Sequence, residues 1–175
     1  MNDLQRLKQL IPFPVHPLEI GSPEKWIAVE HTLRTILPTD YKQFVDNYGS
    51  GYIGGFLYFR NPFSSKPYMN LIYQLDEFVS TSDTEFESTL PYSFFPKPSG
   101  LLPFGATING DSIFWVTNNS PDKWSIFILE ARGTTHAHYH NTMTEFVVHF
   151  LEGDINNDVF SSEFIKDGNL FNPNI

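Results

Sequence analysis

The stretch LPTDYKQFVDNYG, residues 37–49, contains the clearest helix signal in the chain. Four of its residues follow the i, i+3, i+4, i+7 spacing that places apolar side chains on one face of a helix: Tyr41, Phe44, Val45 and Tyr48. Thr39 offers an oxygen that can cap the first turn, and Asp40 favours the positive helix start. Gly49 can adopt the left-handed backbone that ends a helix. The stretch predicts a helix over roughly residues 39–48.

Two further helices are expected before this stretch. Asp3 is expected to cap a short first helix, which Pro12 ends. Ser22 and Pro23 form an N-cap pattern with proline at the first helical position, and they begin a second helix. The apolar stripe of that second helix consists of Trp26, Val29, Leu33 and Ile36.

The residues that follow predict a sheet. Aromatic and β-prone residues occur at 52–59, and a further strand is expected around 134–139. Residues 112–117 and 124–130 are apolar on both faces, which is typical of central strands covered on both sides. A turn at residues 118–122 separates these two strands.

The remaining segments complete an α+β pattern. Residues 70–79 return to helical spacing with Asn70 as the cap, and residues 91–103 are expected to be extended or looped because prolines recur there. Thr142 and Glu145 form a capping box for a last helix that ends at Gly153. We therefore expect one domain over residues 1–175, in which N-terminal and C-terminal helices flank a mostly antiparallel sheet. The tail, residues 154–175, is left unassigned.

The charge is distributed unevenly along the chain, whose net charge is -9. Residues 67–175 hold fourteen acidic and four basic residues, whereas residues 1–66 hold six and seven. The first acidic cluster consists of Asp76, Glu77, Asp83, Glu85 and Glu87. The second consists of Glu145, Glu152, Asp154 and Asp158, and it continues to Glu163 and Asp167. Such charge repels phosphate backbones, which argues against direct nucleic-acid binding. It forms either a solvated, solubilising surface or a contact surface for a partner.

The residue types exclude several classes of site. The chain has no cysteine, so it has neither disulfides nor thiolate metal ligands, and this suits a reducing compartment. We find no secretory signal and no apolar run long enough to span a membrane, so a cytoplasmic location without membrane contact is expected.

Three patterns deserve a functional test. Residues 49–54 match G-x-G-x-x-G, but they follow a helix and precede a strand, which is the reverse of a dinucleotide-binding loop, so a helix cap and close turn is favoured.

His136, His138 and His140 alternate, so on a strand their imidazoles share one side. No carboxylate lies close in sequence except Glu145, so an exposed and pH-sensitive strand face is favoured over a metal site. Asp111 is expected to bond backbone amides in a turn rather than act as a catalytic acid. We therefore predict no catalytic residue, no metal and no cofactor.

Taken in order, these elements resemble the SUKH superfamily, which includes bacterial immunity proteins and fungal regulators of cell-wall glucan synthesis. The resemblance extends over roughly residues 22–153 and does not account for residues 92–103. It is carried by Leu37-Pro38, Asp40-Tyr41, Phe44, Tyr48-Gly49-Ser50-Gly51, Asn61-Pro62-Phe63, Pro103-Phe104-Gly105, Asn109-Gly110-Asp111, Trp115 and the stretch from Thr142 to Phe146. Most of these residues are turn and core formers, so they specify the scaffold.

The resemblance implies an α+β fold and a non-enzymatic, protein-binding role. Bacterial members of the superfamily look like antidotes that bind and neutralise toxin domains, which are often nucleases. The expected partner is therefore a cognate toxin domain, and both acidic clusters are candidate contact surfaces. Two alternatives stay open: a regulatory interaction module like the fungal relatives, and a small-molecule or metal-dependent enzyme that uses Asp111 or the histidine triplet.

Overall fold

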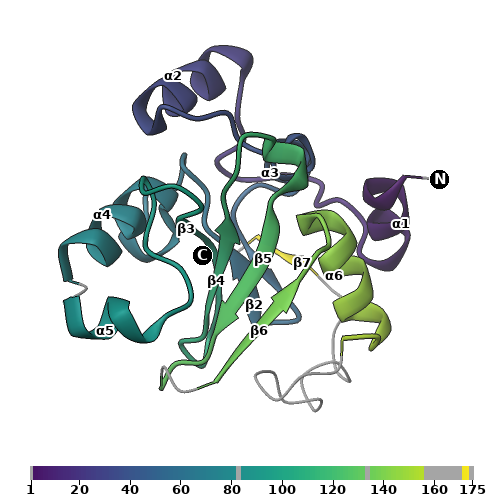
Figure 1. The fold of residues 1–175 in the computed structure, drawn as a ribbon. Coiled ribbons are helices and arrows are strands. Elements are labelled where there is room, and N and C mark those ends of the chain that lie inside the picture. Colours follow the sequence, from purple (N-terminus) through teal and green to yellow (C-terminus); the bar gives the residue numbers. More distant parts are fainter. Residues whose placement is uncertain (1, 82–83, 133–134, 156–170, 174–175) are drawn as a thin grey trace.

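The computed structural model describes residues 2–81, 84–132, 135–155 and 171–173 (Figure 1). The strands of this part form one seven-stranded sheet in the order β6-β5-β4-β3-β2-β1-β7. Their bounds are β1 Tyr52–Ile53, β2 Leu57–Phe59, β3 Leu101–Thr107, β4 Ser112–Val116, β5 Ser125–Leu129, β6 His136–Tyr139 and β7 Phe171–Asn172. Every neighbouring pair is antiparallel.

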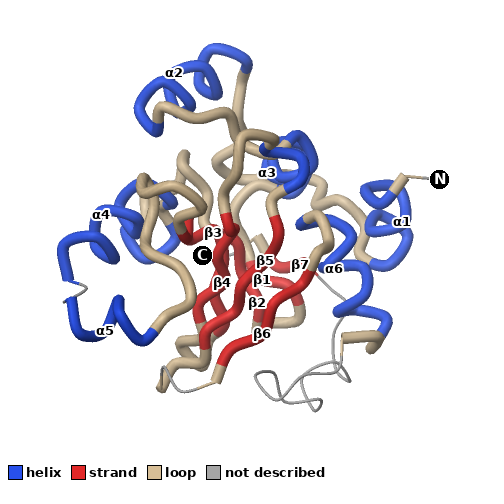
Figure 2. Tube along the Cα trace, viewed as in Figure 1, coloured by secondary structure: helices blue, strands red, loops and turns tan. Residues whose placement is uncertain are grey.

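Helices cover both faces of the sheet (Figures 1 and 2). The α-helices are α1 Asp3–Leu10, α2 Pro23–Leu33, α3 Thr39–Tyr48, α4 Leu71–Thr81, α5 Thr84–Thr89 and α6 Met143–Glu152. Two short 3-10 turns, η1 Pro67–Met69 and η2 Pro121–Lys123, complete the described elements. The predicted α+β class is confirmed. Among the described residues, no helix is both long enough and apolar enough to cross a membrane.

Strand β4 shows how the two faces are filled. Trp115 packs edge-on against Tyr41 of α3, with ring centroids 4.9 Å apart. Its neighbour Phe114 points to the other face and meets Phe78 of α4 at 5.1 Å. Because adjacent residues of a strand point to opposite faces, this alternation requires cover on both sides. The prediction that β4 and β5 are two-sided central strands is confirmed, since both strands contribute to two separate apolar cores.

The central strand of the sheet, β3, was not predicted. It lies in the middle of the strand order and all seven of its residues are buried. Proline is normally absent from central strands because it cannot donate to the ladder. Here the pairing with β4 shifts between Pro103 and Gly105, so the proline occupies an irregularity in the ladder.

The ends of two helices differ from the sequence prediction. The cap of α1 is Asn2 rather than Asp3, because the Asn2 side chain accepts the Gln5 N–H at 2.9 Å and forms a capping box with it. Helix α2 ends at Leu33, where Arg34 adopts the left-handed conformation. Ile36 therefore does not continue the apolar stripe, and its side chain is 62% exposed.

Two predicted caps are confirmed. Asn70 accepts the N–H groups of Ile72 and Tyr73, both at 3.0 Å, and so begins α4. The capping box of Thr142 and Glu145 begins α6, which ends at the left-handed Gly153.

The turn after α3 is closely packed. Gly49 has φ +70° and ψ -151°, a combination that essentially only glycine adopts, and not the left-handed helical conformation that the sequence suggested. A Cβ at this position would lie 2.0 Å from the carbonyl oxygen of Leu18. The glycine-rich stretch is thus a helix end and a closely packed turn, as predicted. Strand β1 comes after this helix end, whereas a dinucleotide-binding loop requires a helix there.

Candidate functional site

A groove with a volume of about 830 Å³ opens beside α4. Four segments that are distant in sequence line it: the end of α2, one side of α4, the loop 95–99 and the turn between β4 and β5. Leu75 and the buried Trp124 give it an apolar wall, and Val79 lies at its rim with 49% of its surface exposed. Asp76 places a carboxylate in the same groove.

One wall of the groove is fixed by polar contacts. Lys97 Nζ lies 2.7 Å from Glu87 Oε1, and Glu87 also accepts the Phe94 N–H at 3.1 Å. The contact with Lys97, followed by that with Phe94, holds the pKa of Glu87 below its usual value. Thr117 donates its hydroxyl to the Gly100 carbonyl at 2.9 Å and ties the loop to the end of β4. The loop is therefore held against the sheet.

The first acidic cluster lies on α4 and α5. Asp76, Glu77 and Glu85 are exposed, and none of them forms an ion pair with a residue in the part of the chain that the structure describes. Glu87 differs because it is paired with Lys97. Asp83 lies outside the described residues. The cluster thus supplies three carboxylates that no cation neutralises within the described chain.

The second acidic cluster lies on the opposite side of the sheet, at α6 (Figure 1). Glu145 belongs to the capping box of that helix. Glu152 binds Arg6 of α1, with 3.0 Å between Arg6 Nε and Glu152 Oε1. Asp158, Glu163 and Asp167 lie outside the described residues. The structure therefore separates the two acidic clusters rather than joining them in one surface.

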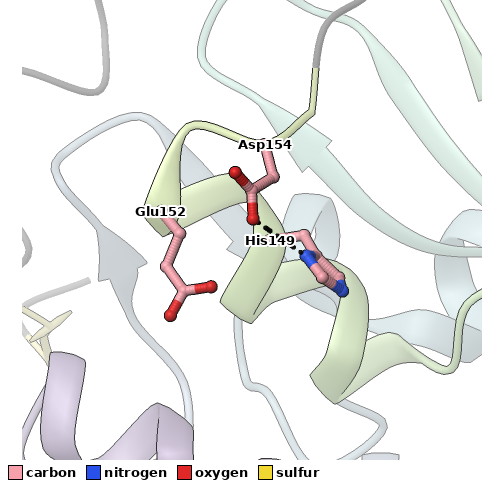
Figure 3. A group of neighbouring side chains, drawn as sticks. All are labelled: His149, Glu152 and Asp154. Carbon is pink, nitrogen blue, oxygen red and sulfur yellow. Dashed lines mark hydrogen bonds and ion pairs between the residues drawn. The ribbon is translucent and has the colours of Figure 1, made fainter.

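The end of α6 gathers His149, Glu152 and Asp154 (Figure 3), whose potential ligand atoms lie within 4.8 Å of one another. Gly153 reverses the chain, so Asp154 folds back and its Oδ2 lies 3.3 Å from His149 Nδ1. Within the described ranges this is the one group of three or more such side chains. Arg6 already contacts both carboxylate oxygens of Glu152 and would compete with any cation there.

His136 and His138 lie on β6, an edge strand of the sheet, and His140 directly follows its last residue. The imidazoles of His136 and His138 point away from α6, since the alternate residue Tyr139 packs on Phe146 of α6 at 5.4 Å. The rings of His138 and His140 have centroids 4.8 Å apart. Burial, followed by the charges of His140 and His136, holds the pKa of His138 below its usual value.

Asp111 occupies the turn before β4. It is buried, and its Oδ2 accepts the Thr107 hydroxyl at 2.6 Å while Oδ1 accepts the Ala131 N–H at 3.1 Å. The carboxylate thereby joins the β3–β4 turn to the end of β5. These contacts describe a turn-forming side chain.

The residues that carry the resemblance build the interior. Tyr41 donates its hydroxyl to the Arg60 carbonyl, and Tyr48 donates to the Ile11 carbonyl at 2.7 Å. Gly105 lets the Phe59 ring approach, because a Cβ there would lie 3.0 Å from it. The remaining scaffold residues also lie at helix ends, in turns or in the core: Pro38, Phe44, Gly51, Gly110 and Trp115.

Sequence reasoning did not find the groove itself. Its lining includes Arg34, Pro96 and Asn118, which belong to three different segments. Each segment was predicted only as a helix end, a loop or a turn. No local pattern signals that these segments meet, because the meeting depends on how α2 and α4 pack around the central strand.

A family model described as SUKH_6, SMI1-KNR4 cell-wall, matches residues 23–147. The match begins at the first residue of α2 and ends within α6, so it includes all the segments that line the groove. No curated protein matches the chain.

Proposed function

The chain belongs to the SUKH superfamily through its SMI1-KNR4 family match over well over half of its length, and from this premise we propose that it is a non-enzymatic, immunity-type protein that binds and neutralises a toxin domain. The toxin contacts the acidic groove face, which we define as Asp76, Glu77, Glu85 and the groove beside α4. The observation that carries this proposal is that Asp76, which forms no ion pair within the described residues, lines a groove with an apolar wall. Arg34 and Lys97 line the same groove.

The charge on this face selects a basic partner. Surface carboxylates without a neighbouring cation attract a positively charged protein over about one Debye length and speed its encounter. Nuclease domains present positively charged surfaces, because they bind phosphate backbones. An acidic surface that docks there also occupies the groove in which the nucleic acid would lie.

The groove supplies the short-range part of the contact. Asp76 and Val79 lie on the same side of α4 and line it together. Apolar and aromatic side chains that enter such a hollow usually dominate binding energy, while the surrounding polar groups exclude water. We infer that the toxin inserts an apolar side chain beside Val79 and places a basic side chain on Asp76.

The α6 cluster is less suited to this role. Arg6 neutralises Glu152, and His149 contacts Asp154. A partner would have to displace these intramolecular contacts before it gained its own. This difference provides a matched control within the same protein.

Where a toxin gene lies beside this gene, the test uses the toxin domain that it encodes. We expect the wild-type protein to rescue growth on co-expression and to form a complex on gel filtration. Asp76→Lys should weaken binding at least tenfold by calorimetry, about 1.4 kcal/mol, whereas Asp154→Lys on the opposite side should change it less than threefold. Failure of the wild-type protein to rescue or to bind would overturn the proposed function, and equal effects of the two variants would overturn the proposed surface.

The matched family is described by the cell wall, which favours a second candidate function. In that case the same face binds a cellular enzyme or scaffold and regulates it, as the superfamily resemblance to glucan-synthesis regulators implies. The gene context distinguishes the two. A toxin gene directly beside this gene favours immunity, and a housekeeping neighbourhood without a toxin gene favours regulation.

A further inference from the structure

The face of β6 that carries the histidines has the geometry of a chelating pair. His138 lies on β6 and His140 directly follows the last residue of that strand, and their rings lie side by side. With metal–nitrogen distances of about 2.0–2.1 Å, two imidazoles bound to one tetrahedral metal have ring centroids roughly 5 Å apart. The observed separation of the two centroids is 4.8 Å. The separation of the two rings therefore matches that of two ligands of one ion.

A neighbouring strand supplies the support that metal-binding imidazoles require. Ser125 Oγ of β5 lies 2.7 Å from His138 Nε2. In the tautomer protonated at Nε2, His138 donates this hydrogen bond to Ser125, and Nδ1 keeps its lone pair. A hydrogen bond from the second ring nitrogen to a fixed acceptor is the usual way in which proteins orient a metal-ligating histidine. The Tyr92 hydroxyl lies 3.4 Å from Nδ1, so a metal bound at Nδ1 takes the place of this long contact.

His140 and His136 lie in different environments. His140 is exposed and makes no hydrogen bond with any residue that the structure describes, so its nitrogens are accessible. His136 instead stacks on the Phe127 ring with centroids 5.2 Å apart, which turns it toward the sheet. The first two therefore form the site, and His136 lies beside it.

We propose that His138 and His140 bind one divalent transition-metal ion, of the class of Zn²⁺, Ni²⁺ or Cu²⁺, on the surface of β6, with Ser125 as a positioning residue. Two neutral imidazoles suit these borderline metals, and waters complete the coordination. Hard cations such as Mg²⁺ prefer oxygen ligands, so they are not bound there. The sequence argued against a metal here because no carboxylate is near in the chain. The structure adds the hydrogen-bonded serine and the ring separation, neither of which is visible in the sequence.

The proposal is tested by calorimetric titration of the full chain, free of any histidine tag, with ZnCl₂, NiCl₂ and MgCl₂. We expect one zinc or nickel ion to bind and magnesium not to bind. His138→Ala and His140→Ala should each abolish the binding, and Ser125→Ala should weaken it about 10-fold, as the loss of an orienting partner does. His136→Ala should change the affinity less than threefold.

The second control separates this site from the group at the end of α6. His149→Ala removes the imidazole of that group, and we expect it to leave zinc and nickel binding unchanged. Loss of binding in His149→Ala with retention in His140→Ala would overturn the proposal, as would the absence of binding to the wild-type protein at about 1 mM metal, which would saturate even a weak site. If His138→Ala does not fold, His140→Ala alone decides, because His140 is exposed and its removal leaves the core intact.

Discussion

At the scale of single residues, two glycines with similar φ values occupy different surroundings. Gly49 has φ +70° and Gly55 has φ +66°. A Cβ on Gly49 would collide with the Leu18 backbone, whereas a Cβ on Gly55 would meet nothing within 4 Å. Both positions therefore carry backbone strain in a substituted residue, and Gly49 alone adds a steric clash.

We predict that Gly49→Ala destabilises the protein much more than Gly55→Ala. A non-glycine residue in such a backbone conformation costs of order 1–3 kcal/mol, and only Gly49 adds a clash with a main-chain atom that cannot turn away. Gly55→Ala should lower the free energy of unfolding by about 1 kcal/mol and Gly49→Ala by about 3 kcal/mol or more. Urea denaturation at neutral pH measures both values. Similar losses for the two variants would show that the passage of Leu18 over this turn is not tight.

Other residues carry no sequence signal of their environment. Arg60 follows a short strand, where an exposed cation would be ordinary, yet it is only 3% exposed. Its Nη1 donates to the Gly105 carbonyl at 2.8 Å, and its guanidinium lies 5.5 Å from the centre of the Phe78 ring. Burial lowers the pKa of Arg60 to about 10, against an opposing effect of Tyr58. A position of this kind depends on how α4 packs over β2 and β3, which one sequence does not show.

At the scale of elements, α3 is capped from a distant part of the chain. Its N-cap residue, Pro38, offers no side-chain acceptor, and the Thr39 N–H donates instead to Asp122 Oδ1 at 2.6 Å. Asp122 belongs to η2, so the cap ties α3 to the turn between β4 and β5. The sequence placed the cap on Thr39 because local signals show only local partners.

We predict that Asp122→Ala destabilises the protein by about 1 kcal/mol, the usual cost of a lost N-cap. Thr39→Ala removes only the 3.3 Å contact between its hydroxyl and Asp122 Oδ2, and it keeps the main-chain donor. Its effect should therefore be smaller, within about 0.5 kcal/mol. Thermal and urea unfolding of the two variants provide the comparison. An unchanged stability of Asp122→Ala would mean that water replaces this cap without cost.

The elements that were predicted correctly share one property. Helices α3, α4 and α6, and strands β4 and β5, repeat apolar residues at a regular spacing and are bounded by caps or turns within the sequence. Strand β3 has Pro103 and Gly105 in its middle, so the same rules indicate a loop. It is nevertheless the centre of the sheet, because the β4 and β2 ladders hold it from both sides.

At the scale of the whole molecule, the arrangement of layers determines which charges can act together. The two acidic clusters are similar in composition, but the sheet places their described members, on α4 and α5 and at α6, on opposite sides (Figure 1). Sequence analysis identified the carboxylates of the acidic groove face but could not show that those of α6 meet Arg6 and His149. Local ion pairing and the meeting of the ends of α2 and α4 at one groove are tertiary properties. Because of these two properties, only one of the two acidic clusters is a candidate contact surface.

This arrangement predicts how binding to the toxin domain depends on salt. The acidic groove face acts over long range through Asp76, Glu77 and Glu85, whereas Val79 acts only on contact. Raising NaCl from about 50 to 500 mM should slow association with the wild-type protein at least tenfold, because screening shortens the reach of exposed charges.

Stopped-flow association measures this dependence. The triple variant Asp76→Asn, Glu77→Gln, Glu85→Gln should associate slowly at low salt and lose most of the salt dependence. Val79→Ala should keep the wild-type salt dependence and instead speed dissociation, since contact residues act mainly on the lifetime of a complex. A salt dependence that survives in the triple variant would place the electrostatic contact outside the acidic groove face, and it would leave the groove as an apolar site only.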